Sequence, residues 1–120
     1  MILGIGVDIV ETARIRAIHD KYGDSFAQKL QVSIEELEYI RDKKKDMIEY
    51  LGSVWASKEA VYKALYQSGY RLTHMNEIKM SRSDPFPEVI APSYEGIRVH
   101  LSLSHEKGAI VAFAIVEKTG

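Results

Sequence analysis

Apolar residues recur at helical spacing in the middle of the chain, and this pattern predicts one long helix over residues 46–68. Two charged residues interrupt it: Lys58 falls inside the apolar stripe, and Glu59 lies among the aromatic residues of the neighbouring stripe. Burying either charge is costly unless it is paired or bound to something. A surface pair between Glu59 and Lys63 is one interpretation, and a functional site is the other. The apolar stripe contains Met47, Leu51, Val54, Val61 and Leu65, and the aromatic stripe contains Trp55, Tyr62 and Tyr66.

Isoleucine, leucine and valine dominate residues 2–10, which predicts a buried first strand. In an extended chain, Gly4, Gly6 and Asp8 share one face, and the two glycines let another backbone or a ligand approach closely. Asp8 is therefore a carboxylate near the end of an otherwise apolar strand. An N-cap for the helix that follows is the alternative role of Asp8, although Glu11 or Thr12 could also cap that helix.

Shorter helical patterns cover residues 13–22, 26–30 and 34–40, with breaks between them. Ser33 and Glu36 form a capping-box pattern at the start of the third. Gly69 is expected to end the long central helix.

In the last part of the sequence, the residue pattern is that of β-strands. Residues 97–104 and 109–117 predict two strands joined by a tight turn at 106–108, preceded by short strands at 78–81 and 88–90. The last strand is apolar on both faces, so we expect helices to cover one face and another subunit the other. These elements predict a single α+β domain over residues 1–120, with helices packed on one face of a mostly antiparallel sheet.

Composition narrows the function classes. The chain has 120 residues, 46% of them hydrophobic and 28% charged, with a net charge of -1. This balance gives no argument for nucleic-acid binding. The absence of cysteine excludes disulfides and thiolate metal sites. No apolar run is long enough for a membrane span, and the apolar start contains Asp8, so it predicts a strand instead of a signal peptide. A cytoplasmic protein is expected.

Asp8 and Glu59 offer oxygen ligands for a hard divalent ion if the first strand meets the central helix. Mg²⁺ is commonly held by one or two carboxylates, with water and substrate phosphates as the other ligands. Lys58 and Lys63 could then hold phosphate groups, and Ser104 and His105 could add a hydroxyl and an imidazole. This predicts Mg²⁺-dependent chemistry on a phosphate or pyrophosphate. The alternative to a phosphate site is purely structural: the charged residues would form a buried pair that neutralises itself, and His105 would be an ordinary histidine of the hairpin turn.

Three motifs follow one another at characteristic spacing. They read Gly4-Ile-Gly-Val-Asp-Ile-Val-Glu11, then Trp55-Ala-Ser-Lys-Glu-Ala-Val-Tyr-Lys-Ala64, then Val99-His-Leu-Ser-Leu-Ser-His105. Together they resemble the signatures of the holo-[acyl-carrier-protein] synthases, the short 4'-phosphopantetheinyl transferases. The resemblance covers nearly the whole chain. It implies transfer of the phosphopantetheine arm of coenzyme A to a serine of an acyl carrier protein, with adenosine 3',5'-bisphosphate as the other product.

The resemblance also implies roles for single residues. Asp8 and Glu59 would hold Mg²⁺, Lys63 would contact phosphate oxygens with support from Lys58, and His105 with Ser104 would lie near the nucleotide from a neighbouring subunit of a trimer. Arg14 and Phe26 would contact the carrier protein. Asp8, Glu59 and His105 all remain candidates for the base that takes the serine proton.

Three departures from the family pattern are visible. Val54 stands where an arginine is usual, Tyr66-Gln-Ser-Gly69 replaces a glycine-rich segment, and Asp84-Pro-Phe-Pro87 replaces an asparagine–glycine turn. They motivate an alternative, a non-catalytic module that binds coenzyme A or a carrier protein. A small oligomeric structural protein is the third hypothesis. Which carrier is the partner, whether from fatty acid, polyketide or another pathway, does not follow from the sequence.

Overall fold

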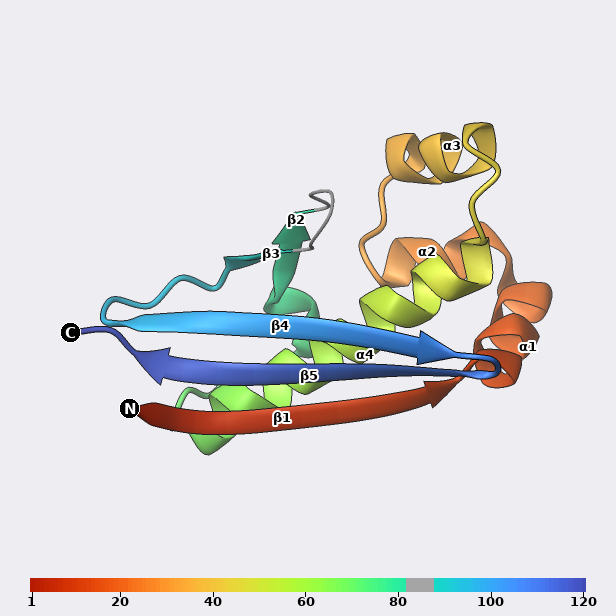
Figure 1. Ribbon diagram of the computed structural model, residues 1–120. Helices are drawn as coiled ribbons and strands as arrows, with labels where there is room; N and C mark the ends of the chain where they lie inside the picture. The colour runs from red at the N-terminus through yellow and green to blue at the C-terminus, as the bar shows by residue number, and fades with distance from the viewer. Residues whose placement is uncertain (82–87) are drawn as a thin grey trace.

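A three-stranded antiparallel sheet forms one layer of the molecule (Figure 1). The computed structural model describes residues 1–81 and 88–120, so the loop expected at 84–87 lies outside the described residues. The strands lie in the order β1 (Ile2–Glu11), β5 (Ala109–Lys118) and β4 (Ile97–Glu106), with β4 and β5 joined as the predicted hairpin. The strand that ends the chain is therefore the central one.

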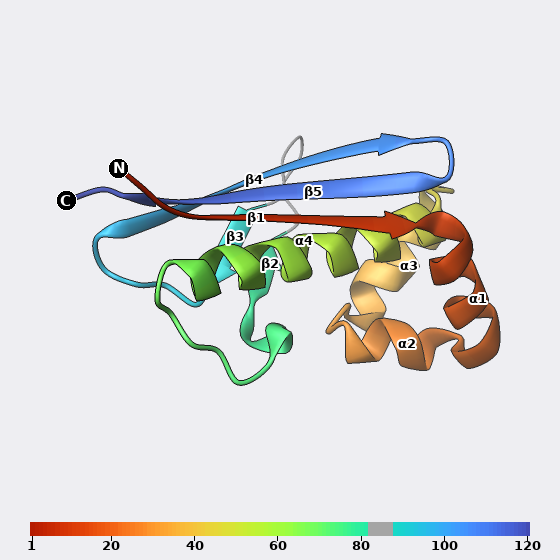
Figure 2. The ribbon, with the colours of Figure 1, turned by 90° about the horizontal axis from the view of Figure 1, so that it is seen from below.

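The helices lie on one face of this sheet, which confirms the predicted α+β class (Figure 2). They are α1 (Thr12–Tyr22), α2 (Asp24–Lys29), α3 (Ile34–Asp42), α4 (Met47–Gln67) and the short 3-10 helix η1 (Met75–Glu77), which the sequence pattern did not predict. A separate two-stranded sheet pairs β2 (Lys79–Ser81) with β3 (Glu88–Ala91). Within the described ranges, no helix combines the length and apolar character needed to cross a membrane.

Local signals in the sequence set the ends of the helices. Ser33 caps α3, because its hydroxyl accepts a hydrogen bond from the backbone N–H of Glu36 at 3.1 Å. Asp46 caps α4 in the same way, accepting from the two backbone N–H groups of Ile48 and Glu49. Gly69 follows α4 with a φ of 97°, as expected for a glycine that ends a helix.

Helix α4 packs closely against β1 because two glycines leave room for its backbone. A Cβ at Gly6 would lie 1.9 Å from the carbonyl oxygen of Ala60, and one at Gly4 would lie 2.2 Å from that of Ala64. The predicted close approach is therefore to the backbone of a helix. Two residues of strand and four of helix both advance about 6–7 Å, so β1 and α4 stay in register.

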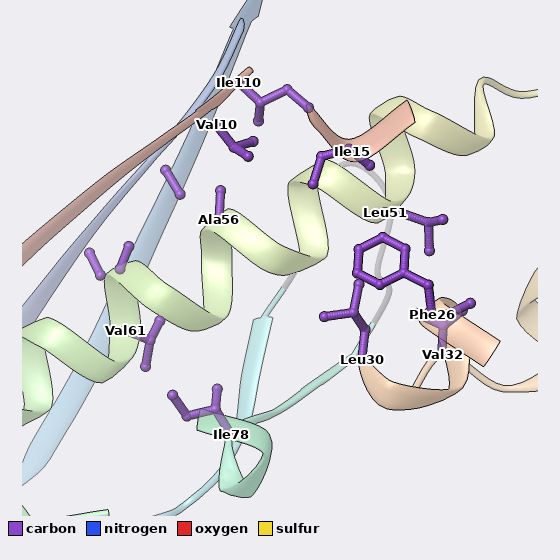
Figure 3. Close-up of a cluster of buried hydrophobic side chains, with 14 of the residues drawn as sticks. Val10, Ile15, Phe26, Leu30, Val32, Leu51, Ala56, Val61, Ile78 and Ile110 are labelled. Carbon is purple, nitrogen blue, oxygen red and sulfur yellow. The ribbon is translucent and has the colours of Figure 1, made fainter. Parts of the chain in front are cut away.

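The core lies between α4, the sheet and the short helices (Figure 3). Leu51, Val61 and Leu65 of the predicted apolar stripe are buried, whereas Val54 and Met47 are only partly buried. The stripe that faces the sheet was not predicted, because it consists of small residues that give a weak hydrophobic pattern. Its members are Gly52, Ala56, Ala60 and Ala64.

The opposite face of the sheet carries no helix in the described part of the chain (Figure 2). Val7 of β1 pairs with Phe113 of β5, and both are exposed, at 51% and 41%. Ile5 and Ile9 flank Val7 on the same face and are also exposed. The strand β5 is thus apolar on both faces, and the interface with another subunit stays a prediction.

Candidate active site

Asp8 and Lys63 meet between the first strand and the central helix. The Nζ atom of Lys63 lies 3.3 Å from Oδ1 of Asp8 and donates a hydrogen bond to the backbone carbonyl of Val7 at 3.2 Å. The Asp8 side chain is 16% exposed, and that of Lys63 is 50% exposed. Asp8 is not a helix cap, since Glu11 occupies the N-cap position of α1. The alternative role considered for Asp8 is therefore wrong, and its carboxylate pairs with Lys63 instead of capping a helix.

Glu59 lies one helical turn before Lys63 on the same side of α4. Gly6 packs against Ala60, so the register of β1 and α4 brings Asp8, the next inward residue of the strand, to the turn formed by residues 56–60. Glu59 is half-buried in this turn and makes no hydrogen bond or ion pair with any described residue. The predicted surface pair of Glu59 with Lys63 is absent, because Lys63 binds Asp8 instead.

Asp8 contacts Lys63, and Glu59 lies one turn before Lys63 on the same side of α4. Two carboxylates and one lysine therefore lie along this junction of β1 and α4, which leaves an excess of negative charge. No third histidine, aspartate or glutamate joins them as a metal cluster among residues 1–81 and 88–120. A pair of carboxylates beside a lysine fits Mg²⁺, which usually keeps several waters and shares substrate phosphates. The donor set therefore suits a metal that arrives with a phosphate substrate, and it does not form a closed all-protein site.

The side chain of Lys58 points in a different direction from that of Glu59, although the two residues are adjacent in the sequence. Its side chain is 3% exposed, and Nζ donates to the carbonyl of Leu30 at 2.8 Å and to Oδ1 of Asn76 at 3.3 Å. Burial and, to a smaller extent, the charge of Lys79 together lower the pKa of Lys58 to about 8, while Glu36 acts in the opposite direction. The structure thus places Lys58 among α2, α4 and η1, away from Asp8. Its phosphate-supporting role stays a prediction.

Ser104 and His105 lie on β4, two strands away from β1. His105 lies across the sheet from Val10, on the helix side, and its Nε2 is 3.2 Å from Oε1 of Glu49. Ser104 pairs with Val111 and shares the open face with the apolar residues of β1 and β5. Within one chain, neither residue makes a contact with Asp8 or Lys63. Their predicted role requires a neighbouring subunit.

Arg14 and Phe26 meet at Trp55, a contact that the sequence pattern did not reveal. The guanidinium carbon of Arg14 lies 5.4 Å from the centroid of the Trp55 ring, and the Phe26 ring is tilted against the same ring at 5.9 Å. Phe26 is only 5% exposed. The structure therefore gives Phe26 a core position, while Arg14 remains on the surface.

A hollow of about 200 Å³ lies between β3 and the start of β4. Val89, Tyr94 and Arg98 are among the residues that line it. None of the predicted site residues does so, and the hollow is therefore not the basis of the functional assignment.

Comparison with known families identifies the class of protein. The model of the 4'-phosphopantetheinyl transferase superfamily matches residues 4–114, so this chain belongs to that superfamily. Among curated relatives, a holo-[acyl-carrier-protein] synthase of Chlorobaculum tepidum is 38% identical over 116 residues, covering 94% of this chain and 97% of that protein. The synthase of Nitrosospira multiformis is also 38% identical, over 98% of this chain and its own whole length.

Solved structures agree with this assignment. The fold is similar to a holo-[acyl-carrier-protein] synthase from Neisseria meningitidis, with a TM-score of 0.76, 30% identity and coverage of 98% of this chain and 100% of that one. It is also similar to the Helicobacter pylori synthase in complex with coenzyme A, with a TM-score of 0.72, 30% identity and coverage of 94% and 99%. The family expected from the three motifs is thereby confirmed.

Proposed function

We propose that this protein is a holo-[acyl-carrier-protein] synthase. It transfers 4'-phosphopantetheine from coenzyme A to a serine hydroxyl of an apo acyl carrier protein. The serine oxygen bonds to the phosphorus that carries pantetheine, the bond from that phosphorus to the bridging oxygen breaks, and its electron pair leaves with adenosine 3',5'-bisphosphate. Full-length similarity to synthases, one of them in complex with coenzyme A, supports this proposal. The observation that carries the site is the contact of Asp8 with Lys63 beside Glu59.

Asp8 and Glu59 would hold Mg²⁺ at the junction of β1 (Ile2–Glu11) and α4 (Met47–Gln67). The metal, when bound, supplies positive charge that neutralises the pyrophosphate. Lys63 binds phosphate oxygens by turning its half-exposed ammonium from Asp8 toward the substrate. Of the three candidates for the proton acceptor, Asp8 is paired with Lys63 and His105 with Glu49. Glu59 has no hydrogen bond or ion pair with the described residues, which favours it as the group that takes up the serine proton by way of an intervening water.

Assembly as a trimer would complete the site. Ser104 and His105 lie two strands from Asp8 in one chain, so a neighbouring subunit is needed to bring them to the nucleotide. The exposed apolar face around Val7 and Phe113 is a suitable interface, because burying such side chains is favourable.

Arg14 is assigned to the carrier protein, and Phe26 supports it from the core. A cytoplasmic location is part of this proposal, because the apolar first residues form the strand β1 instead of resembling a signal peptide.

The test is the intact mass of apo carrier proteins after incubation with this protein, coenzyme A and Mg²⁺, with a chelator control. A carrier that becomes heavier by one phosphopantetheine only when metal is present supports the proposal. Binding of coenzyme A without transfer to carriers of fatty acid and polyketide synthesis would instead support the non-catalytic module. Mass gain in the presence of chelator would contradict the metal assignment alone.

A further inference from the structure

Lys63 binds one of the two carboxylates that the proposed function assigns to the metal. Its Nζ atom lies 3.3 Å from Oδ1 of Asp8, and this is the one ion pair that Asp8 makes within residues 1–81 and 88–120. The proposed function also assigns Lys63 to the phosphate oxygens of coenzyme A. The lysine therefore has two alternative partners in the same site, the carboxylate and the substrate phosphate.

The ion pair opposes a metal at Asp8. The Asp8 side chain is only 16% exposed, so water and salt screen its surroundings less than they screen an open surface. A divalent cation that approaches Asp8 also meets the ammonium of Lys63, whichever carboxylate oxygen it binds. Like charges a few ångströms apart repel each other appreciably near a protein surface. While Lys63 stays on Asp8, only the carboxylate of Glu59 is left without a compensating charge among the described residues.

Lys63 is able to leave Asp8 without leaving the site. Its side chain is 50% exposed, and a lysine ammonium carries three donors at the end of a flexible stem. One of these donors contacts the backbone carbonyl of Val7 at 3.2 Å, which lies directly beside Asp8 in the strand. That contact keeps the ammonium at the junction of β1 and α4 while another donor passes from Asp8 to a phosphate oxygen.

A pyrophosphate provides the driving force for this exchange. It carries more negative charge than a single carboxylate, and lysine forms strong charge-assisted hydrogen bonds with phosphate oxygens. Its arrival therefore draws Lys63 away from Asp8. The same pyrophosphate offers further oxygen ligands to a metal that Asp8 and Glu59 hold. Release of Asp8 and supply of ligands thus occur together, and both favour binding of the metal.

We propose that Lys63 blocks the metal site of the free protein by pairing with Asp8, and that the phosphate groups of coenzyme A release this block. This inference rests on the proposed synthase function. It assigns to Lys63 a part of the coupling between metal and substrate, in addition to its contact with phosphate. By thermodynamic linkage, coenzyme A and the metal each raise the affinity for the other by the same factor.

The first test measures binding of Mn²⁺, which carboxylates also accept, to the protein without coenzyme A. The electron paramagnetic resonance signal of free Mn²⁺ reports the bound fraction. Lys63→Met is expected to bind Mn²⁺ roughly three- to tenfold more tightly than the wild type, because the competing charge is gone. Lys63→Arg keeps that charge and should bind as weakly as the wild type. Lys118→Met removes an equal charge at the end of β5 and should stay within about twofold of the wild type.

The second test measures binding of coenzyme A by calorimetry in the presence of a chelator. Asp8→Asn frees Lys63 for the phosphates, so it should tighten coenzyme A binding at least about threefold more than Glu59→Gln does. Glu59→Gln is the matched control, since it removes the same charge from this junction and leaves the pair of Asp8 with Lys63 intact. In the Lys63→Met background, Asp8→Asn should lose this advantage over Glu59→Gln. Equal effects of the two substitutions in the wild-type background would show that net charge alone sets the affinity, which would overturn the inference.

The two ligands are then combined. With saturating coenzyme A, the tighter Mn²⁺ binding of Lys63→Met should disappear, because the wild-type lysine has already left Asp8. Unchanged or weaker Mn²⁺ binding by Lys63→Met in the free protein would overturn the inference, and so would an advantage that persists with coenzyme A. In either case, transfer by the wild type would still uphold the proposed function. A wild-type protein that binds no coenzyme A and transfers nothing to any carrier would overturn both.

Discussion

Lys63 joins the central helix to the first strand through two contacts, to the carboxylate of Asp8 at 3.3 Å and to the carbonyl oxygen of Val7 at 3.2 Å. Both contacts are made by one half-exposed ammonium. Screening by water makes such a pair worth at most about 1 kcal/mol of stability. Its position beside Asp8 and Glu59 therefore points to a role in substrate binding more than in folding.

Lys63→Met tests this role. We expect transfer to fall by roughly 100-fold, since one charged contact to the reacting phosphate is lost, while the free energy of unfolding changes by less than about 1 kcal/mol. Kinetics and chemical denaturation of the same preparation measure the two effects. Lys118→Met removes an exposed lysine at the end of β5 (Ala109–Lys118) and serves as the control, with both quantities unchanged. Retained activity in Lys63→Met would remove Lys63 from the site.

Gly6→Ala tests the close packing of α4 against β1. The added Cβ would meet the carbonyl oxygen of Ala60 at 1.9 Å, and a backbone atom cannot move aside without shifting the helix. We expect a loss of about 3 kcal/mol or more of unfolding free energy, as for other strongly overpacked sites. Gly108→Ala, which has open space around it and a φ of 86°, should cost only about 1 kcal/mol. Equal costs in a denaturant titration would contradict the packing argument.

The pH dependence of stability tests the burial of Lys58. Burial lowers the pKa of Lys58 from 10.5 to about 8 in the folded protein, with Lys79 adding to the effect. Between these two pH values the unfolded chain binds more protons than the folded chain, so the contribution of Lys58 to stability rises as pH rises. The difference in unfolding free energy between the wild type and Lys58→Met should therefore shift in favour of the wild type from pH 8 to 10. A constant difference would show that Lys58 is well solvated.

Val7→Glu tests the interface proposed on the open face of the sheet. Val7 pairs with Phe113 at the centre of that face, and a carboxylate there would be buried without a partner in an assembly. We expect Val7→Glu to be monomeric in sedimentation velocity and to lose transfer, since the site needs a second subunit. Ile90→Glu, at an exposed position of β3 (Glu88–Ala91), is the control and should keep the assembly. A wild-type protein that sediments as a monomer would exclude the trimer.

Elements with regular periodicity or clear end signals could be predicted from the sequence. The hairpin of β4 and β5, the cap at Ser33 and the end of α4 at Gly69 are all present in the structure. The face of α4 that meets the sheet could not be predicted in the same way. Alanine and glycine contribute little to a hydrophobic pattern, although Ala60 and Ala64 lie directly against Gly6 and Gly4.

The candidate site was predictable only in part, because side chains close in sequence can point in different directions. Asp8 and Lys63 are in contact because the strand and the helix that carry them pack against each other. Lys58 is adjacent to Glu59 yet reaches Leu30 and Asn76, and no local signal marks Asn76 as its partner. Strand alternation places Ser104 and His105 on opposite faces of β4, so the two side chains do not face one common group within a single chain.

The most direct measurement of the central claim is a time course of apo carrier mass, with coenzyme A and Mg²⁺, for the wild type, Asp8→Asn and Glu59→Gln. Each substitution keeps the shape of the side chain and removes its charge, so circular dichroism should be unchanged. Our account predicts conversion of the carrier by the wild type and a rate at least about 100-fold lower for both variants. The control Glu95→Gln, in an exposed loop, should match the wild type. Conversion by Asp8→Asn or Glu59→Gln at the wild-type rate would contradict the assignment of this site.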